Sequence, residues 1–262
     1  MSYVMDVEGE FLRLEEQNKT KNYNIFEDID FINPQAGEKI LDAGSGSGLL
    51  LREIYKRNTE VELFGVDYSD IRVKQASKYC NERGLPIKLS QGNLLDLSQF
   101  ESESFDKVVC RFVYEYLIDP VAVTTELKRV LKKGGELILI DNDGVLFNIY
   151  SQNEILNSLL STLKTNINVD LYVGRKLPFF IHKAGFKDVN WNSISKDFVA
   201  EEKVAEMKNN ERRFTFAKEE MVRVLGSEEI YKKFCEIYIS EMKKDETIIF
   251  MNKFLVKGVK DV

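Results

Sequence analysis

Short apolar runs and amphipathic segments alternate over residues 39–140. The apolar runs have the length and residue types of buried strands, and they occupy 39–42, 61–66, 87–89, 105–110 and 136–140. The segments between them show the spacing of amphipathic helices, at 49–57, 69–83 and 120–131. Strands that alternate with helices of this length predict a parallel sheet with helices on both faces.

The flanking parts of the chain follow a different pattern. Apolar residues recur at near-helical spacing over 1–33, until Pro34 and Gly37 break the pattern. Beyond Asp143 the pattern predicts helices at 145–164, at 171–184 with an interruption near Pro178, and over most of the charge-rich stretch 197–247. Two more strands are expected, at 186–194 and 247–259.

No repeat or Pro/Ser-rich linker divides the chain, so we expect one domain over 1–262. Its expected parts are an N-terminal helical cover (1–33), a ligand-binding core (34–144) and substrate-side helices with the last strands (145–262). Within the third part, the helical insertion at about 197–247 would act as a lid on the core.

Composition narrows the class of protein. The 262 residues are 44% hydrophobic, enough for a sizeable core, and the net charge of −6 disfavours a general nucleic-acid partner. Three separated cysteines, Cys80, Cys110 and Cys235, support neither a disulfide framework nor a cysteine-rich metal site. Because no apolar leader or bilayer-length run occurs, we expect a soluble cytoplasmic protein with no membrane partner.

A glycine-rich loop follows the first predicted strand. Gly44, Gly46 and Gly48 alternate with serines between that strand and the next predicted helix. Glycines let the chain turn sharply and bring its backbone against a ligand, while the helix start offers free N–H groups. A tight strand-to-helix turn without a ligand would have the same sequence, so the neighbouring residues must separate the two interpretations.

Two acidic residues favour the ligand-binding interpretation. Asp67 closes the second predicted strand, 19 residues after Gly48, where an acid can accept hydrogen bonds from both hydroxyls of a ribose. As an alternative, Asp67 is an N-terminal acid of the helix that begins near Ser69. Asp42 stands just before the loop and suits a ligand with an ammonium or sulfonium better than one with phosphates. The spacing GxGxG, rather than GxGxxG, also disfavours a dinucleotide, and together these features point to S-adenosylmethionine.

With these features, the chain resembles the class I S-adenosylmethionine-dependent methyltransferases, of the small-molecule branch. The matching segments extend over roughly residues 37–144 and are Ile40–Gly48, Phe64–Ser69, Gln91–Asp96, Phe105–Pro120 and Leu127–Glu136. The resemblance implies an α/β, Rossmann-like, doubly wound sheet of about seven strands, mostly parallel with the last strand antiparallel. Helices would cover both faces, and a helical lid would be added.

The resemblance also implies roles for individual residues. The methionine portion of the cofactor would be surrounded by the loop, with Asp42, Gly44, Ser45, Gly46 and Gly48. The ribose would be held by Asp67. Tyr68 would lie against the adenine, whose edge would face the Asn93 side chain and the Leu94 N–H; many family members carry Asp where Asn93 stands. Cys110 and Arg111 would meet the methionine end. Arg111 would pair either with the methionine carboxylate or with Glu115.

Catalytic residues are less clearly indicated. Asp141 and Asp143 follow the fifth strand, where a base could reach a substrate, but an Asn-Asp-Gly turn explains them equally well. Aromatic side chains could stabilise the sulfonium, although such residues more often belong to the core; the candidates are Tyr3, Tyr23, Phe112 and Tyr114. Arg13 and Gln17 could close over the cofactor or form a solvated face, and His182 fits a helix-end cation better than a base.

We therefore expect a methyltransferase that moves a methyl group from S-adenosylmethionine to a small molecule, with S-adenosylhomocysteine as the product. We expect no metal in the site, and either a monomer or a homodimer. Three alternatives remain open: a cofactor-binding regulator without transfer activity, a methyltransferase acting on protein or RNA, and a nicotinamide-dependent oxidoreductase. The acceptor is not identified, because one fold and cofactor motif serve many chemistries.

Overall fold

A seven-stranded sheet forms the centre of the structure, a computed structural model that describes residues 9–17, 23–199 and 201–261. Its strands are β1 (Lys39–Ala43), β2 (Glu62–Asp67), β3 (Ile87–Gln91), β4 (Phe105–Arg111), β5 (Leu131–Asp143), β6 (Lys187–Asp197) and β7 (Phe250–Val259). The strand order is β3-β2-β1-β4-β5-β7-β6, and β7 runs antiparallel to both of its neighbours. The predicted fold class is confirmed.

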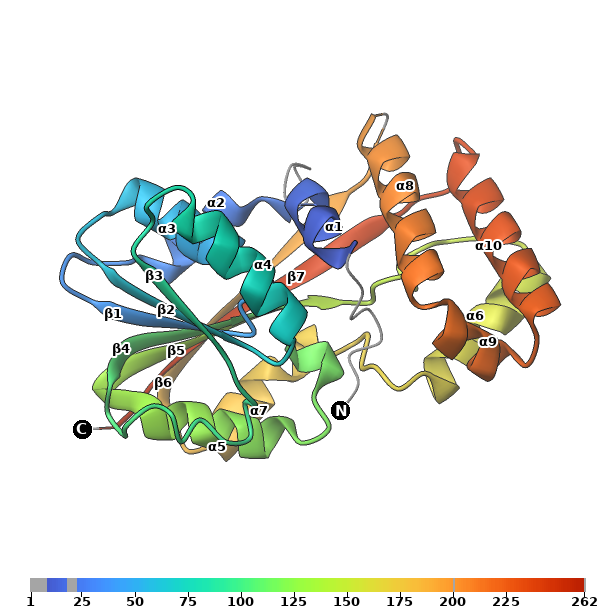
Figure 1. Ribbon diagram of the computed structural model, residues 1–262. Helices are drawn as coiled ribbons and strands as arrows, with labels where there is room; N and C mark the ends of the chain where they lie inside the picture. Colours follow the sequence, from blue (N-terminus) through green and yellow to red (C-terminus); the bar gives the residue numbers. More distant parts are fainter. Residues whose placement is uncertain (1–8, 18–22, 200, 262) are drawn as a thin grey trace.

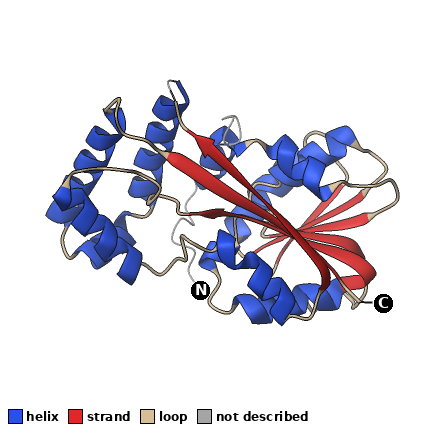
Figure 2. Ribbon diagram, turned by 180° about the vertical axis from the view of Figure 1, so that it is seen from behind, coloured by secondary structure: helices blue, strands red, loops and turns tan. Residues whose placement is uncertain are grey.

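Helices cover both faces of this sheet (Figures 1 and 2). They are α1 (Glu10–Gln17), α2 (Ile25–Ile32), α3 (Leu49–Arg57), α4 (Asp70–Asn81), α5 (Pro120–Val130), α6 (Glu154–Asn166), α7 (Leu177–Lys183), α8 (Glu201–Phe216), α9 (Lys218–Leu225) and α10 (Glu228–Lys243), with 3-10 turns η2 (Tyr114–Tyr116) and η3 (Gly174–Lys176). One core cluster joins α5 and α7 to the sheet, and a second joins α2, α3 and α4 to its other face.

Helices α6, α8, α9 and α10 form a separate layer beyond one end of the sheet (Figure 1). Aromatic rings fill its apolar centre: Phe214 contacts both Phe234 and Tyr238, with ring centroids 5.4 and 5.3 Å apart. This layer contains the helical insertion that the sequence predicts at about 197–247, and it packs beside the edge of the sheet where β5 ends.

Two predicted helices begin later than expected. The helix expected at 145–164 begins at Glu154, because the Asn153 side chain accepts the Leu156 N–H and so caps the helix there. Pro178 does not interrupt a helix at 171–184; it lies in the first turn of α7, where its missing N–H costs no hydrogen bond. The expected helical segment 1–33 is represented by α1 and α2, and residues 1–8 and 18–22 lie outside the described part.

The strand order creates a crevice at the carboxyl ends of β1 and β4. From β1 the chain proceeds outward to β2 and β3, and it then returns to β4 on the opposite side of β1. Open α/β sheets bind their ligands where the strand order reverses in this way. The glycine-rich loop after β1 therefore lies at the edge where a ligand is expected.

Candidate functional site

The glycine loop makes a close turn from β1 into α3. Gly44 has φ +89°, a conformation that side-chain-bearing residues rarely adopt, and a Cβ on it would lie 2.3 Å from Val113 Cγ2. Gly48 occupies the N-cap position of α3, also with positive φ. The loop can therefore pass close beneath the segment after β4 only with glycine at position 44.

A cavity of about 730 Å³ opens beside this loop, at the carboxyl edge of the sheet. This volume lies in the range of small-molecule sites, which is roughly 300–1,000 Å³. Its walls include nine of the eleven residues that the sequence predicts for cofactor binding: Asp42, Gly44, Ser45, Gly46, Asp67, Tyr68, Asn93, Leu94 and Arg111. Gly48 and Cys110 are not among its lining residues.

Asp42 is a buried acid in the wall of this cavity. Burial raises the pKa of its carboxyl to about 7, against the opposing effect of Arg111 and with a smaller contribution from Asp67. Within the described part of the chain, neither Asp42 Oδ1 nor the buried Ser45 Oγ has a hydrogen-bond partner. Buried polar atoms are normally satisfied, so these two acceptors point to a ligand that donates hydrogen bonds.

Asp67 is held by its surroundings from two sides. Its Oδ2 accepts a hydrogen bond from the Gly46 N–H at 2.8 Å, and its Oδ1 accepts one from the Ser69 N–H at 2.9 Å. The same Oδ1 forms an ion pair with Arg72, whose Nη2 lies 2.9 Å away. Ser69, rather than Asp67, caps α4, through the Arg72 N–H at 3.3 Å. The sequence analysis did not identify Arg72, which is buried and also lines the cavity.

Arg111 is the last residue of β4 and lines the cavity. Its Nε lies 2.7 Å from Asp28 Oδ2, and its guanidinium lies over the Phe112 ring. Asp28 on α2 is fully buried, and sequence analysis named neither this residue nor this pair. The motif gave no signal for it, because the two residues lie 83 positions apart in the chain.

The residues expected around an adenine also line this cavity. Tyr68 is 50% exposed and lines the cavity, so its ring is available to cover a bound ligand. Leu94 is buried, and Asn93 Oδ1 accepts the Leu95 N–H at 3.0 Å. The Asn93 side chain therefore first stabilises its own turn.

Comparison with known proteins agrees with this geometry. Residues 41–139 match the family model described as "Methyltransferase domain". The chain is 31% identical over 135 residues to the ubiquinone biosynthesis O-methyltransferase of Hahella chejuensis, covering 50% of this chain and 53% of that protein. It is 34% identical over 108 residues to the phosphatidylethanolamine N-methyltransferase of Cereibacter sphaeroides, covering 40% and 51% respectively. The match of residues 41–139 supports the resemblance of this chain to the class I S-adenosylmethionine-dependent methyltransferases.

Solved structures share the fold at lower identity. The YcgJ protein of Bacillus subtilis superposes with a TM-score of 0.60 at 18% identity, covering 91% of this chain and 98% of that one. A phosphoethanolamine N-methyltransferase 2 of Haemonchus contortus superposes with a TM-score of 0.63 at 18% identity, covering 100% and 61%. The chain spans about half the length of the two curated relatives named above.

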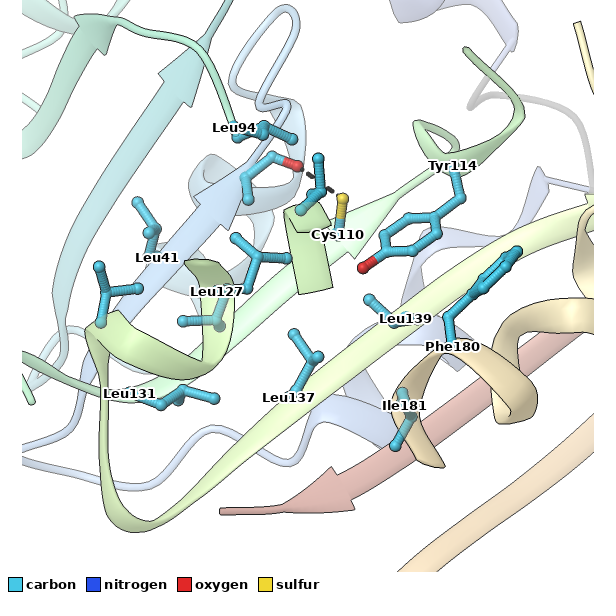
Figure 3. Packing of buried hydrophobic residues seen from close by; sticks show 14 of the residues in the cluster. Leu41, Leu94, Cys110, Tyr114, Leu127, Leu131, Leu137, Leu139, Phe180 and Ile181 are labelled. Atoms are coloured by element: carbon cyan, nitrogen blue, oxygen red, sulfur yellow. Dashed lines mark hydrogen bonds between the residues drawn. The ribbon is translucent and has the colours of Figure 1, made fainter. Parts of the chain in front are cut away.

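Cys110 and Tyr114 require correction, because both side chains belong to the core (Figure 3). The Cys110 thiol donates to the Ala43 carbonyl at 3.0 Å, and burial raises its pKa well above the ordinary value. Tyr114 packs against Phe180, and its hydroxyl lies 2.8 Å from Thr124 Oγ1. Burial likewise raises the pKa of Tyr114, so neither group is placed to act on a bound molecule.

Asp141 and Asp143 also have structural partners instead of a place in the cavity walls. Asp141 accepts the Tyr114 N–H at 2.9 Å, and burial followed by the charge of Glu115 raises its pKa. Asp143 accepts the Arg175 backbone N–H at 3.0 Å and forms an ion pair with the Arg175 guanidinium. The sequence correctly places both acids at the end of β5, but their carboxylates organise neighbouring turns.

A second, narrower cavity of about 120 Å³ adjoins the first. The two share five lining residues, which are Leu14, Phe112, Tyr116, Val169 and Glu220. Apolar side chains from α8, α9 and the segment after β5 form most of the remaining wall. Four polar residues interrupt it: Arg13, Glu115, Asn142 and Arg213. The sequence analysis gave only Arg13 a possible place near the ligand.

The other sequence candidates have varied positions. Phe112 lines both cavities, and Tyr23 packs edge-on against it with the ring centroids 6.2 Å apart. Tyr3 lies outside the described residues, and Gln17 is the last residue of α1. His182 lies in the last turn of α7, where the sequence predicts a helix-end cation.

In the described ranges, no group of three or more His, Cys, Asp or Glu side chains could hold a metal ion. No helix in those ranges has the length and apolarity to span a membrane.

Proposed function

We propose that this protein transfers a methyl group from S-adenosylmethionine to a small-molecule acceptor and releases S-adenosylhomocysteine. The observation that carries the proposal is the pair of buried acids, Asp42 and Asp67, in one cavity of small-molecule size at the carboxyl edge of the sheet. An ammonium and two ribose hydroxyls are the donors that such a pair would satisfy.

The residues present fit this cofactor. The partnerless Asp42 Oδ1 and Ser45 Oγ can accept hydrogen bonds from its methionine portion, beside the Gly44–Gly46 backbone. Asp67 would bind the ribose and share its carboxylate with Arg72. Tyr68 would cover the adenine, whose edge would face Asn93 and Leu94.

The bound cofactor would supply an activated methyl group, so the protein must mainly position the acceptor and exclude water. The second cavity supports this role, because its largely apolar wall meets the first cavity at Phe112 and Tyr116. Its volume of about 120 Å³ favours a small acceptor over a folded macromolecule. A regulator that binds cofactor without transfer would have the same first cavity, and turnover distinguishes it.

Calorimetric titration with S-adenosylhomocysteine, with NADH in parallel, tests the cofactor assignment. We expect saturable binding of S-adenosylhomocysteine alone. Asp67→Asn removes the charge from the expected ribose contact and should weaken that binding by about 1.5–3 kcal/mol, roughly ten- to a hundredfold. Asp70→Asn is the matched control, since Asp70 lies on the same turn but pairs with exposed Lys74.

Circular dichroism should show that both variants are folded. Binding of NADH in place of S-adenosylhomocysteine would overturn the cofactor assignment. An unchanged dissociation constant in folded Asp67→Asn would remove Asp67 from the binding site while leaving the rest of the proposal testable.

A further inference from the structure

Glu115 is one of the polar residues in the largely apolar wall of the second cavity. It is the middle residue of η2, the turn that follows β4, and its neighbour Tyr116 lines both cavities. The wall around it includes the apolar side chains of Leu146, Phe214 and Met221. Placing a charged group in such a wall costs free energy unless a neighbouring group or a bound molecule pairs with it or donates a hydrogen bond to it.

The turn that carries Glu115 is fixed on two sides. Asp141 accepts backbone N–H bonds from Tyr114 and Glu115, and the Tyr114 ring is anchored in the core. The Glu115 carbonyl accepts the Asp170 N–H at 2.8 Å, which ties the turn to the segment before η3. Asp141, which the sequence suggests as a catalytic residue, therefore has a different role: it positions Glu115.

The surroundings of Glu115 have opposing effects on the pKa of its carboxyl group. Burial raises the pKa of Glu115, while a hydrogen bond from Tyr116 and the charges of Arg213 and Arg13 oppose the rise. Both arginines line the same cavity. A carboxylate with a raised pKa is a stronger proton acceptor than one in water, and the nearby guanidiniums would stabilise negative charge on a bound molecule.

We propose that the second cavity binds a small, largely apolar acceptor bearing a weakly acidic hydroxyl, phenol or enol, and that Glu115 receives the hydroxyl proton. This inference rests on the proposed methyl transfer. As the acceptor oxygen bonds to the methyl carbon, the electron pair of the breaking carbon–sulfur bond stays on sulfur, and the hydroxyl proton passes to Glu115. An amine acceptor is disfavoured, because methylation would move the positive charge of the sulfonium onto the acceptor nitrogen, beside Arg13 and Arg213.

Three probes with the same apolar body test this assignment: 2-naphthol, 2-naphthylamine and 2-methoxynaphthalene. Each is titrated by fluorescence into wild-type protein saturated with S-adenosylhomocysteine. We expect 2-naphthol to bind about tenfold more tightly than the other two, the effect of one hydrogen bond to a charged acceptor. Glu115→Gln keeps the side-chain shape and should reduce this preference to about threefold or less, because a neutral amide is a weaker acceptor.

Glu219→Gln is the control, because Glu219 is an exposed carboxylate on α9 that lines neither cavity, and the preference should stay at its wild-type size. Equal binding of the three probes, a preference for the amine, or no binding of 2-naphthol would overturn the proposal. So would a full preference for 2-naphthol in Glu115→Gln. Binding of S-adenosylhomocysteine is measured separately in each protein, so a failure of the cofactor assignment is recognised independently of the acceptor assignment.

Discussion

At the scale of single residues, Asp42 shows how burial changes the ionisation of a carboxyl group. Its pKa lies at about 7 instead of 3.8, chiefly because water is excluded. The folded protein thus holds this proton more tightly than the unfolded chain does. Without ligand, stability is therefore lost as the pH rises from 3.8 towards 7. A ligand ammonium favours the ionised carboxylate, so its binding should expel the proton.

We predict that affinity for S-adenosylhomocysteine increases as the pH rises towards 7, by up to about tenfold per pH unit, and levels off above it. Asp42→Asn has no proton to lose at this position, so its affinity should be weaker and nearly independent of pH. Calorimetry at several pH values measures both curves. The same slope in wild type and Asp42→Asn would assign the proton to another group.

At the scale of elements, helix α1 connects the core to the helical layer (Figure 1). Toward the core, Glu15 accepts the Ser47 hydroxyl at 2.8 Å and pairs with buried Arg52 of α3. Toward the layer, Glu16 pairs with Arg212 of α8, and both of these side chains are about half exposed. The two pairs use adjacent acids of one helix in very different environments.

This difference predicts unequal effects of the same substitution. Glu15→Gln should lower the free energy of unfolding by about 1–3 kcal/mol, because it leaves the buried Arg52 guanidinium without a charged partner. Glu16→Gln should change it by less than about 1 kcal/mol, since water screens an exposed pair. Urea denaturation followed by circular dichroism compares them. Equal effects would mean that α1 does not depend on its contact with α3.

At the scale of the whole molecule, a buried ion cluster joins segments from opposite ends of the chain. Asp28 on α2 contacts Arg111 at the end of β4 and Lys253 on β7, 225 residues away in sequence. Asp28 and Lys253 are 0% and 1% exposed. The cluster thus joins α2 to strands β4 and β7, and its member Arg111 also lines the cavity.

We predict that Asp28→Asn lowers the free energy of unfolding by about 3–5 kcal/mol, because two cations lose the buried carboxylate that both contact. Asp30→Asn on the same helix is the control. Asp30 is exposed and pairs with partly exposed Arg57, so its loss should cost less than about 1 kcal/mol. Chemical denaturation provides the comparison. A small effect in Asp28→Asn would show that a neutral amide satisfies both cations.

Local patterns in the sequence determined the sheet, its glycine turn and the edge at which the site lies. Apolar runs of strand length specify β1, β2 and β4, and parallel strands place their following residues at one edge. For that reason the sequence pattern is sufficient to assign Asp42, Gly44 and Asp67 to one cavity. The family resemblance added the expected roles of residues such as Tyr68 and Asn93.

Only the tertiary structure decided which way the loop side chains face and which distant residues they contact. Tyr114 faces inward, whereas its neighbour Glu115 faces a cavity, and no periodicity governs side-chain direction in a turn of three residues. The partners of Arg111 and Asp143 are equally invisible in the sequence, because they come from separate elements, α2 and η3. Strand periodicity is a local property of the backbone. The residues that pair with a carboxylate, by contrast, come from separate parts of the chain that only folding brings together.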